Sequence, residues 1–293
     1  MRFNEIGQQL RAYRLESGLR AEEIAARLGV SRAALYRYEK GEVIKLDTIK
    51  RLAELLKISP LSLLGIGVEY YHRPVGYFER IRQIEETAEQ ILQVTGPLAY
   101  LVTSHAYDGT LAAALDDLAA QAGSERAQLR AAADQALGLL SARKRLYGQR
   151  KPAIICILSA ARLSRFLETG IAGGAPLSEK IRQMCRQAAA SEVLNIAAMM
   201  ESEPMGLQFG LLTGTEPTGN FKILRAGDRA SLAINPFPPD SIPGVPTGVA
   251  MITTGDEAIA AHQRVAEGLW KEALKGAPAA ARLRELVAAQ RGG

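Results

Sequence analysis

Four side chains, at positions 32, 33, 36 and 37, have the types and the spacing to recognise base pairs in double-stranded DNA. In the stretch SRAALYRYEK the apolar Leu35 must face a core, which in a helix leaves Arg32, Ala33, Tyr36 and Arg37 on the solvent-facing side. An arginine can bond to both O6 and N7 of guanine, and a small alanine can approach a thymine methyl. Tyr36 can meet a sugar, a base or a phosphate. Any single arginine could equally be a solvated surface residue, so the inference depends on the whole face.

Other residues beside this predicted helix are placed to meet the phosphate backbone. They are Ser31, Lys40 and Lys45, together with the backbone of Ala34. Contacts of this kind fix the register and the orientation of a helix on the duplex without specifying sequence.

Short helices must hold these residues in place, and the apolar spacing predicts them throughout residues 1–66. Ser31 is suited to cap the helix from Arg32 to Tyr38, and Ala25 supplies the small residue needed where two helices cross. The predicted helices are one ending at Gly18, then 21–28, 32–38, 46–56 and a last one around Pro60.

The charge of the chain is concentrated in the same region. Residues 1–66 hold 12 Lys and Arg against 8 Asp and Glu, a net of +4, which leaves +1 of the total of +5 for the other 227 residues. A basic end on a nearly neutral remainder indicates a nucleic-acid-binding module carried by a domain with another task.

Residues 18–64 carry a set of landmarks in a fixed order. They are Gly-Leu, a helix ending in Leu-Gly-Val-Ser, a helix ending in Tyr-Glu-Lys-Gly, and an aliphatic last helix. This pattern resembles the Cro/repressor-type (XRE family) helix-turn-helix regulators. The resemblance implies a five-helix, lambda-repressor-like domain over residues 1–66 that binds a double-stranded DNA operator. One short recognition helix contacts too few bases to select a genomic site alone, so we expect a homodimer. Where the family usually has a glutamine that touches a phosphate, this chain has Arg20-Ala21, and Arg20 could replace that contact by charge.

The same resemblance gives Glu39 a structural role. An acid at the end of a DNA-facing helix would repel phosphates, and the family places an arginine of the first helix beside it. The matching residue here is Arg14. We expect an Arg14–Glu39 pair that joins the first helix to the recognition helix; a direct role of Glu39 at the DNA is the alternative.

Residues 67–80 are predicted to be a linker because glycines and a proline recur in GIGVEYYHRPVGYFERI. Its cluster of Tyr70, Tyr71, His72 and Arg73 could touch DNA, although docking between domains is the commoner use of such aromatics. Helical spacing from Tyr77 to about Val94 predicts a connector helix or a dimer seam.

Residues 81–293 are predicted to form a mixed α/β (α+β) domain, because strand-like and helical stretches occur together. The predicted strands are 97–103, 153–158, 205–214, 220–227, 230–237 and 248–255. The predicted helices are one or two within 110–146, then 177–190 and 256–275, the last with Trp270 on its apolar face.

The second domain contains no recognisable catalytic machinery. His72, His105 and His262 lie in separate segments, although the last two could meet in space, and Cys156 and Cys185 read as buried small residues. We therefore expect no catalytic residue, no cofactor and no metal. The absence of a signal peptide or a long apolar run indicates a cytoplasmic protein that does not enter the membrane.

The end of the chain, GVAMITTGDEAIAAHQRVAEGLWKEAL, loosely resembles phospholipase-D-like folds that serve as non-catalytic sensor domains, and the HxK element of the active enzymes is absent. The resulting prediction is a transcriptional regulator whose second domain dimerises and senses a small effector, expected to be largely apolar or weakly polar. The alternative is an enzyme carrying an N-terminal DNA-binding or regulatory module.

Overall fold

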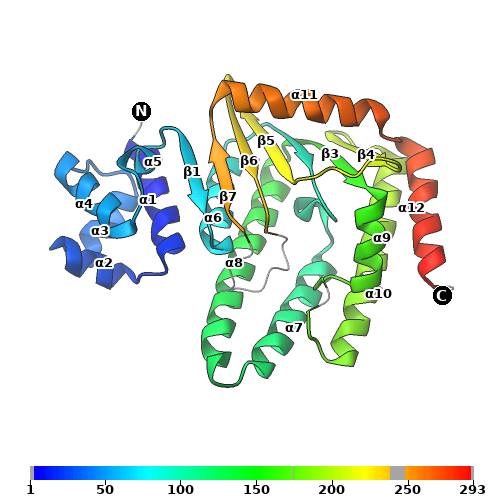
Figure 1. Ribbon diagram of the computed structural model, residues 1–293, viewed down its shortest axis with the longest axis horizontal. Coiled ribbons are helices and arrows are strands. Elements are labelled where there is room, and N and C mark those ends of the chain that lie inside the picture. The colour runs from blue at the N-terminus through cyan, green and yellow to red at the C-terminus, as the bar shows by residue number, and fades with distance from the viewer. Residues whose placement is uncertain (1–2, 174, 238–247, 292–293) are drawn as a thin grey trace.

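The computed structural model describes residues 3–173, 175–237 and 248–291, and Figure 1 shows two parts lying side by side. Residues 3–63 are helical, whereas the later residues build a mixed β-sheet with helices on both faces. The prediction of an all-helical N-terminal region followed by a mixed α/β region is therefore confirmed at this level.

The helical part is built from short helices whose apolar faces meet in one core. In the described residues it contains α1 (Phe3–Ser17), α2 (Ala21–Leu28), α3 (Arg32–Glu39), α4 (Leu46–Leu56) and α5 (Pro60–Leu63). Each helix contributes a large, fully buried aliphatic side chain at the centre: Leu10, Ile24, Leu35, Leu52 and Leu63. Residues 46–56 are helical as predicted, and the third helix extends one residue further than predicted.

The sheet of the second part has seven strands among the described residues, in the order β1-β7-β6-β5-β2-β3-β4. Strands β2, β3 and β4 are parallel to one another, and the other neighbouring pairs are antiparallel. Their bounds are β1 (Val68–Tyr71), β2 (Gln90–Val94), β3 (Ala153–Ser159), β4 (Leu207–Leu212), β5 (Phe221–Ala226), β6 (Arg229–Ile234) and β7 (Ala250–Thr253).

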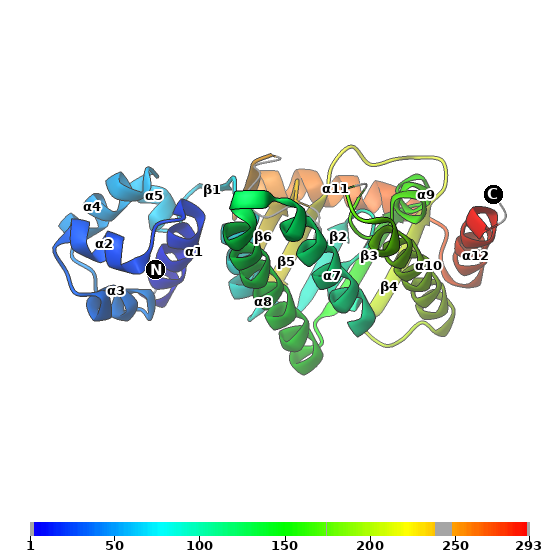
Figure 2. The ribbon, with the colours of Figure 1, turned by 90° about the horizontal axis from the view of Figure 1, so that it is seen from below.

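Helices cover both faces of this sheet, with α11 on one side and α7, α8 and α10 on the other (Figure 2). Strand β3 shows how the sequence serves both faces: Ile154 and Leu158 join the larger core, and Ile157 joins the cluster beneath α11. The helices are α6 (Pro74–Glu85), α7 (His105–Gln121), α8 (Arg126–Arg150), α9 (Ala160–Thr169), α10 (Glu179–Ser202), α11 (Asp256–Glu272) and α12 (Gly276–Arg291), with short 3-10 turns η1 (Tyr100–Val102) and η2 (Gly123–Glu125).

Residues 67–80, predicted as a linker, belong to the fold of the second part. Val68–Tyr71 is an edge strand paired with β7, and Pro74 already begins α6. The glycines that suggested a linker make a short turn instead, since Gly65 and Gly67 have φ values of 71° and 92°. The pattern of β1, with Tyr70 exposed and Tyr71 buried, is that of a strand with one covered face.

The prediction of one helix from Tyr77 to about Val94 is also wrong at its second half. Helix α6 ends at Glu85, and residues 90–94 form β2, the strand between β5 and β3. The strand predicted at 97–103 is absent, and η1 occupies part of that stretch. A run such as ILQV fits a strand or a helix locally, so its pairing with distant strands decides the outcome. The other predicted strands and helices are present with shifted ends, and Cys156 and Cys185 are buried.

Candidate nucleic-acid interface

Helices α2 and α3 and the turn between them form a unit whose local chemistry fixes its shape. Gly29 ends α2 in the left-handed conformation, with φ of 72°, and the backbone N–H of Val30 donates to the carbonyl of Ala25 at 3.0 Å. Ser31 then caps α3 by accepting a hydrogen bond from the N–H of Ala34 at 3.1 Å. Helix α3 therefore starts at a defined angle to α2.

The outer face of α3 presents the residues predicted to read bases. Leu35 is fully buried, whereas Arg32, Ala33 and Arg37 are exposed and Tyr36 is half-buried. The structure thus gathers all four on the outer side of one helix, with the two arginines separated by about 1.4 helical turns.

Both arginines of this face already have acidic partners on the protein surface. Arg32 Nη1 lies 2.7 Å from Glu22 Oε1, and its Nη2 donates to the Tyr36 hydroxyl at 3.2 Å. Arg37 Nε lies 3.3 Å from Glu42 Oε2. All four charged side chains are more than half exposed. Ion pairs of this kind are weak, so DNA could take over either guanidinium at small cost.

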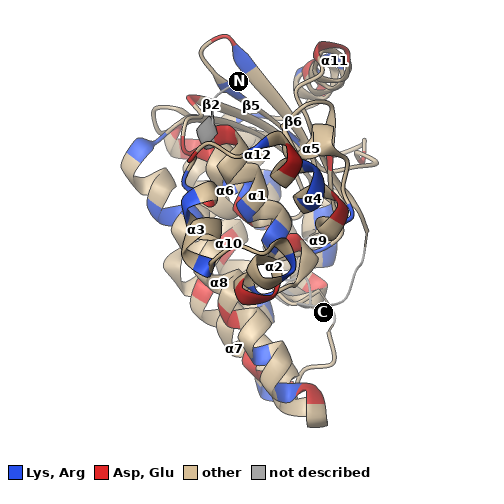
Figure 3. Cartoon of the chain, turned by 90° about the vertical axis from the view of Figure 1, so that its left-hand side faces the viewer, with Lys and Arg blue, Asp and Glu red and all other residues tan. Residues whose placement is uncertain are grey.

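The residues predicted to meet phosphates lie at helix ends around this face. Arg20 precedes α2, Ser31 caps α3, Lys40 ends α3 and Lys45 precedes α4, and all are exposed. Figure 3 views the molecule from this end and shows basic segments on α3 with acidic segments of α2 nearby. The Ser31 oxygen accepts the cap hydrogen bond from Ala34, and its O–H can still donate to a phosphate beside the three basic residues.

Arg14 and Glu39 lie against one another behind this face. Arg14 Nε donates to Glu39 Oε1 at 2.5 Å and Nη2 to Oε2 at 3.1 Å, with the two side chains 14% and 5% exposed. Burial alone would lower the pKa of Arg14, but the hydrogen bond and the charge of Glu39 raise it above its usual value. The pair connects α1 to the end of α3.

We expect Glu39→Gln to lower the free energy of unfolding by about 1–2 kcal/mol, because one charge-assisted hydrogen bond to Arg14 is removed. Glu42→Gln is the matched control: its carboxylate meets Arg37 on the surface, and the change should stay within about 1 kcal/mol. Urea denaturation measures both. Unchanged stability of Glu39→Gln together with altered DNA affinity would instead give Glu39 a direct role at the DNA.

The two parts of the chain are in contact. The sequence indicated this contact only through the aromatic and basic cluster at residues 70–73, and it did not predict the other residues involved. Tyr13 of α1 stacks on Tyr71 of β1, with ring centroids 5.3 Å apart, so this aromatic serves docking between the parts. Glu69, 6% exposed, accepts from Gln9 Nε2 at 2.6 Å, from the Tyr71 hydroxyl at 2.7 Å and from Arg80 Nε at 2.9 Å. Glu69 therefore ties α1, β1 and α6 together.

Helix α1 also packs closely on α6. The Glu16 carboxylate accepts from the backbone N–H of His72 at 2.7 Å and of Arg73 at 3.1 Å. Burial raises the pKa of Glu16, and these N–H donors and the nearby His72 ring act in the opposite direction. A Cβ at Gly76 would lie 2.4 Å from Glu16 Oε2 and 2.8 Å from its Cβ, so only glycine allows this approach.

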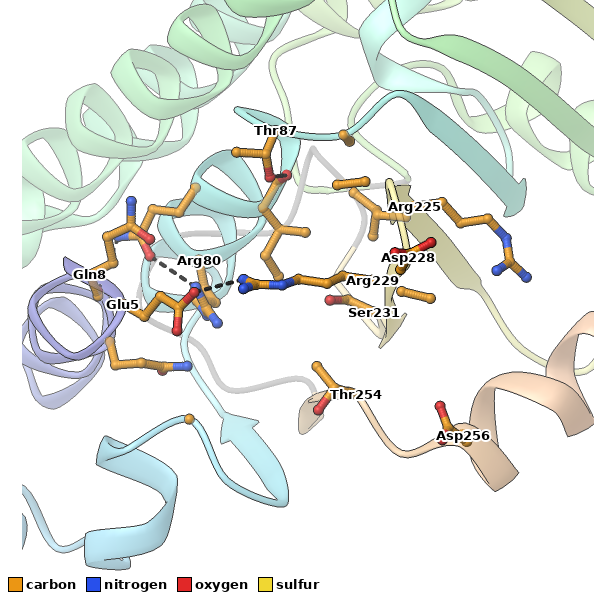
Figure 4. Close-up of a pocket in the computed structure, with 18 of the residues that line it drawn as sticks. Glu5, Gln8, Arg80, Thr87, Arg225, Asp228, Arg229, Ser231, Thr254 and Asp256 are labelled. Atoms are coloured by element: carbon orange, nitrogen blue, oxygen red, sulfur yellow. Dashed lines mark hydrogen bonds and ion pairs between the residues drawn. The ribbon is translucent and has the colours of Figure 1, made fainter. Parts of the chain in front are cut away.

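A cavity of about 620 Å³ lies beside this contact, between α1, α6 and the strands β5 and β6. Figure 4 shows Glu5 and Arg229 reaching toward one another across it, and their charged atoms are 2.8 Å apart. Arg80 is held by Glu69 and Arg225 donates to Gln263. Among its charged lining residues, Glu5, Arg80 and Arg229 are thus already in ion pairs.

The two histidines that could have formed a ligand site do not meet. His105 begins α7 on one side of the sheet, whereas His262 lies on α11 on the other, its ring against Phe221. Across residues 3–173, 175–237 and 248–291, no group of three or more His, Cys, Asp or Glu side chains could hold a metal ion. Nor does any helix in those ranges have the length and apolarity needed to cross a membrane.

Comparison with known proteins identifies the first part. Residues 5–63 match a family model described as a helix-turn-helix domain. No curated protein and no solved structure matches the chain. The chain therefore contains a helix-turn-helix domain that coincides with α1–α5, and such a domain points to a DNA-binding regulator.

Proposed function

We propose that the protein is a sequence-specific transcriptional regulator of the Cro/repressor (XRE) type, acting in the cytoplasm as a homodimer on a double-stranded operator. The observation that carries this proposal is the outer face of α3, where Arg32, Ala33, Tyr36 and Arg37 project from a helix-turn-helix unit. Arginine and alanine at these positions suit guanine edges and thymine methyls in a major groove.

The homodimer follows from the size of the recognition surface. Helix α3 has eight residues, and its outer face offers a few side chains to the bases. One such helix selects too few base pairs to find a site in a genome, whereas two copies related by a two-fold axis read two half-sites. The second part is the place for the dimer contact, because α3 must stay free for DNA.

We propose further that the second part, residues 81–293 together with β1 and the start of α6, senses an effector and has no catalytic activity. The loose resemblance of residues 248–274 to non-catalytic phospholipase-D-like sensors supports this role. Signalling from it to the DNA has a direct route, because α1 packs on α6 through Glu16 and Gly76. A shift of α6 in both subunits would change the spacing of the two recognition helices.

Selection of bound sequences from random duplexes, followed by footprinting, tests this function. We expect protection of two symmetric half-sites separated by about one helical turn, 10–10.5 bp from centre to centre. Gel-shift stoichiometry should give two chains for each protected site. A monomer protecting a single half-turn would contradict the dimer, and binding without any preferred sequence would contradict the regulator.

A further inference from the structure

A small, partly open cavity in the second part is lined by two positively charged side chains. It lies where β2 ends and β5 begins, and its volume of about 40 Å³ corresponds to roughly three water molecules. The charged side chains among its described lining residues are Arg143 and Lys222, both cationic. Its remaining wall includes Tyr77, Phe78 and Tyr100.

One carboxylate offsets these two cations, and Arg143 already holds it. Arg143 Nε and Nη2 donate to the two oxygens of Glu85 at 2.8 Å each, and both side chains are 4% exposed. The Lys222 ammonium lies 3.9 Å from Glu85 Oε1, beyond hydrogen-bond distance. Burial, followed by the charge of Arg143, lowers the pKa of Lys222 to about 8. The Lys222 ammonium therefore lies in a largely buried environment, and it shares the Glu85 carboxylate with Arg143.

A second donor lines the same cavity. Tyr77 is 1% exposed, and within the described part of the chain its hydroxyl has no hydrogen-bond partner. A buried hydroxyl without a partner destabilises a fold, because it has given up its hydrogen bonds to water. Two residues that line this cavity, Lys222 and Tyr77, therefore each carry a donor group without a close acceptor among the described residues.

We propose that this cavity binds a small anion, carrying a carboxylate or a phosphate-type group, which accepts hydrogen bonds from Lys222 and Tyr77 and completes the charge balance with Arg143 and Glu85. The cation–aromatic contacts of Arg143 with Phe78 and Tyr100, at 5.6 and 5.7 Å, hold its guanidinium in place for this balance. The sequence predicts a largely apolar effector, whereas this lining selects a charged one.

Helix α6 connects the anion site to the DNA-binding part. Tyr77 and Phe78 line the cavity, while the neighbouring Gly76 packs on Glu16 of α1 and Gln83 donates to the carbonyl of Gln8 at 3.1 Å. An anion that accepts a hydrogen bond from Tyr77 therefore acts on α6, the helix that packs against α1. The regulatory role of the anion rests on the proposed function; its binding does not.

Titration calorimetry on the full chain tests the binding, with sulfate, inorganic phosphate and acetate as probes at matched ionic strength. We expect saturable binding at millimolar concentrations. Binding of sulfate and phosphate without acetate would indicate a phosphate-type ligand, and binding of acetate alone a carboxylate. Lack of saturable binding for all three would overturn the proposal.

Three variants assign the site. Lys222→Met should weaken binding about tenfold or more and Tyr77→Phe about two- to tenfold, because they remove a charge-assisted and a neutral hydrogen bond respectively. The Lys271→Met variant, which changes an exposed lysine of α11, should bind the anion as the wild type does.

Since burial of the Lys222 charge opposes folding, Lys222→Met should unfold at a higher temperature than the wild type. Equal binding by Lys222→Met and the wild type, or equal losses in Lys222→Met and Lys271→Met, would disprove this site.

A pH series with sulfate, which does not titrate in this range, provides a test without mutation. The titratable groups facing Lys222 are Glu85 and Tyr77 of α6, Arg143 of α8, Cys156 of β3 and Tyr100. Burial raises the pKa of Tyr77, Tyr100 and Cys156, the last to about 12, so Lys222 is the group that loses its proton first as the pH rises from 7. Affinity should fall by about tenfold for each pH unit well above 8. A flat profile up to about pH 9.5 would contradict the proposal. These titrations contain no DNA, so their outcome does not depend on whether the protein binds DNA. Likewise, a failure of anion binding leaves the DNA-binding experiments unaffected.

Discussion

The Glu85→Ala variant should lose about 3–5 kcal/mol of unfolding free energy, one of the two largest effects that we expect from a single substitution. Glu85 is the carboxylate that offsets Arg143 and, more distantly, Lys222 inside the second part. Its removal leaves a buried guanidinium without its two hydrogen bonds and two cations facing each other. Burial acts to lower the pKa of Arg143, and the charge of Glu85 is what keeps it above its usual value.

The exposed pair Arg284–Glu201 supplies the matched control. It is also bidentate, with distances of 2.5 and 2.6 Å, but its side chains are 45% and 42% exposed. Glu201→Ala should therefore change stability by about 1 kcal/mol or less. Urea denaturation followed by the fluorescence of Trp270, which lies in the second part, measures both variants. Similar losses in the two would show that Arg143 finds another partner or reaches water.

The helix-turn-helix part was predictable because its signals are local. Gly29 and Ser31 define the end of α2 and the start of α3 within three residues of chain, and Leu35 fixes which side of α3 faces inward. Helical geometry places Ala33 and Arg37 opposite Leu35, whereas Arg32, the first residue of α3, is exposed although it lies three residues before Leu35. Local signals therefore determined both the fold and the candidate site in this part.

The second part was less predictable because distant contacts decide its elements. The stretch 90–94 is a strand because β3 on one side and β5 on the other complete its hydrogen bonds. The buried charges of this part also depend on distant contacts. Amphipathic patterns predict surface positions for Glu69, Glu85 and Arg143, yet each is buried against a partner. A pattern cannot identify a buried charge when the residue that neutralises it is far away in sequence.

Arg37→Ala, and to a similar degree Arg32→Ala, should weaken binding to the selected operator by roughly 1–3 kcal/mol per half-site, hence about 2–6 kcal/mol for a dimer on a full site. The reason is that each half-site would lose the bidentate hydrogen bond to guanine that the proposed readout assigns to the arginine. Binding to random duplexes should change little. Lys45→Ala should instead weaken both alike and lower the slope of log affinity against log salt by about one unit for each phosphate that the lysine no longer neutralises.

The control for these arginines is Arg130→Ala in α8. Arg130 is 55% exposed and lies 3.4 Å from Asp116, much as Arg32 is 58% exposed and paired with Glu22. Arg130→Ala and Arg32→Ala therefore both remove one surface positive charge and one weak ion pair. The two variants differ in the helix that is changed, α8 or α3. Fluorescence anisotropy on operator and random duplexes at several salt concentrations separates the two effects. Equal losses on operator and random DNA for Arg32→Ala and Arg37→Ala would move both arginines from the bases to the phosphates, and leave Ala33 and Tyr36 as the residues of α3 that read sequence.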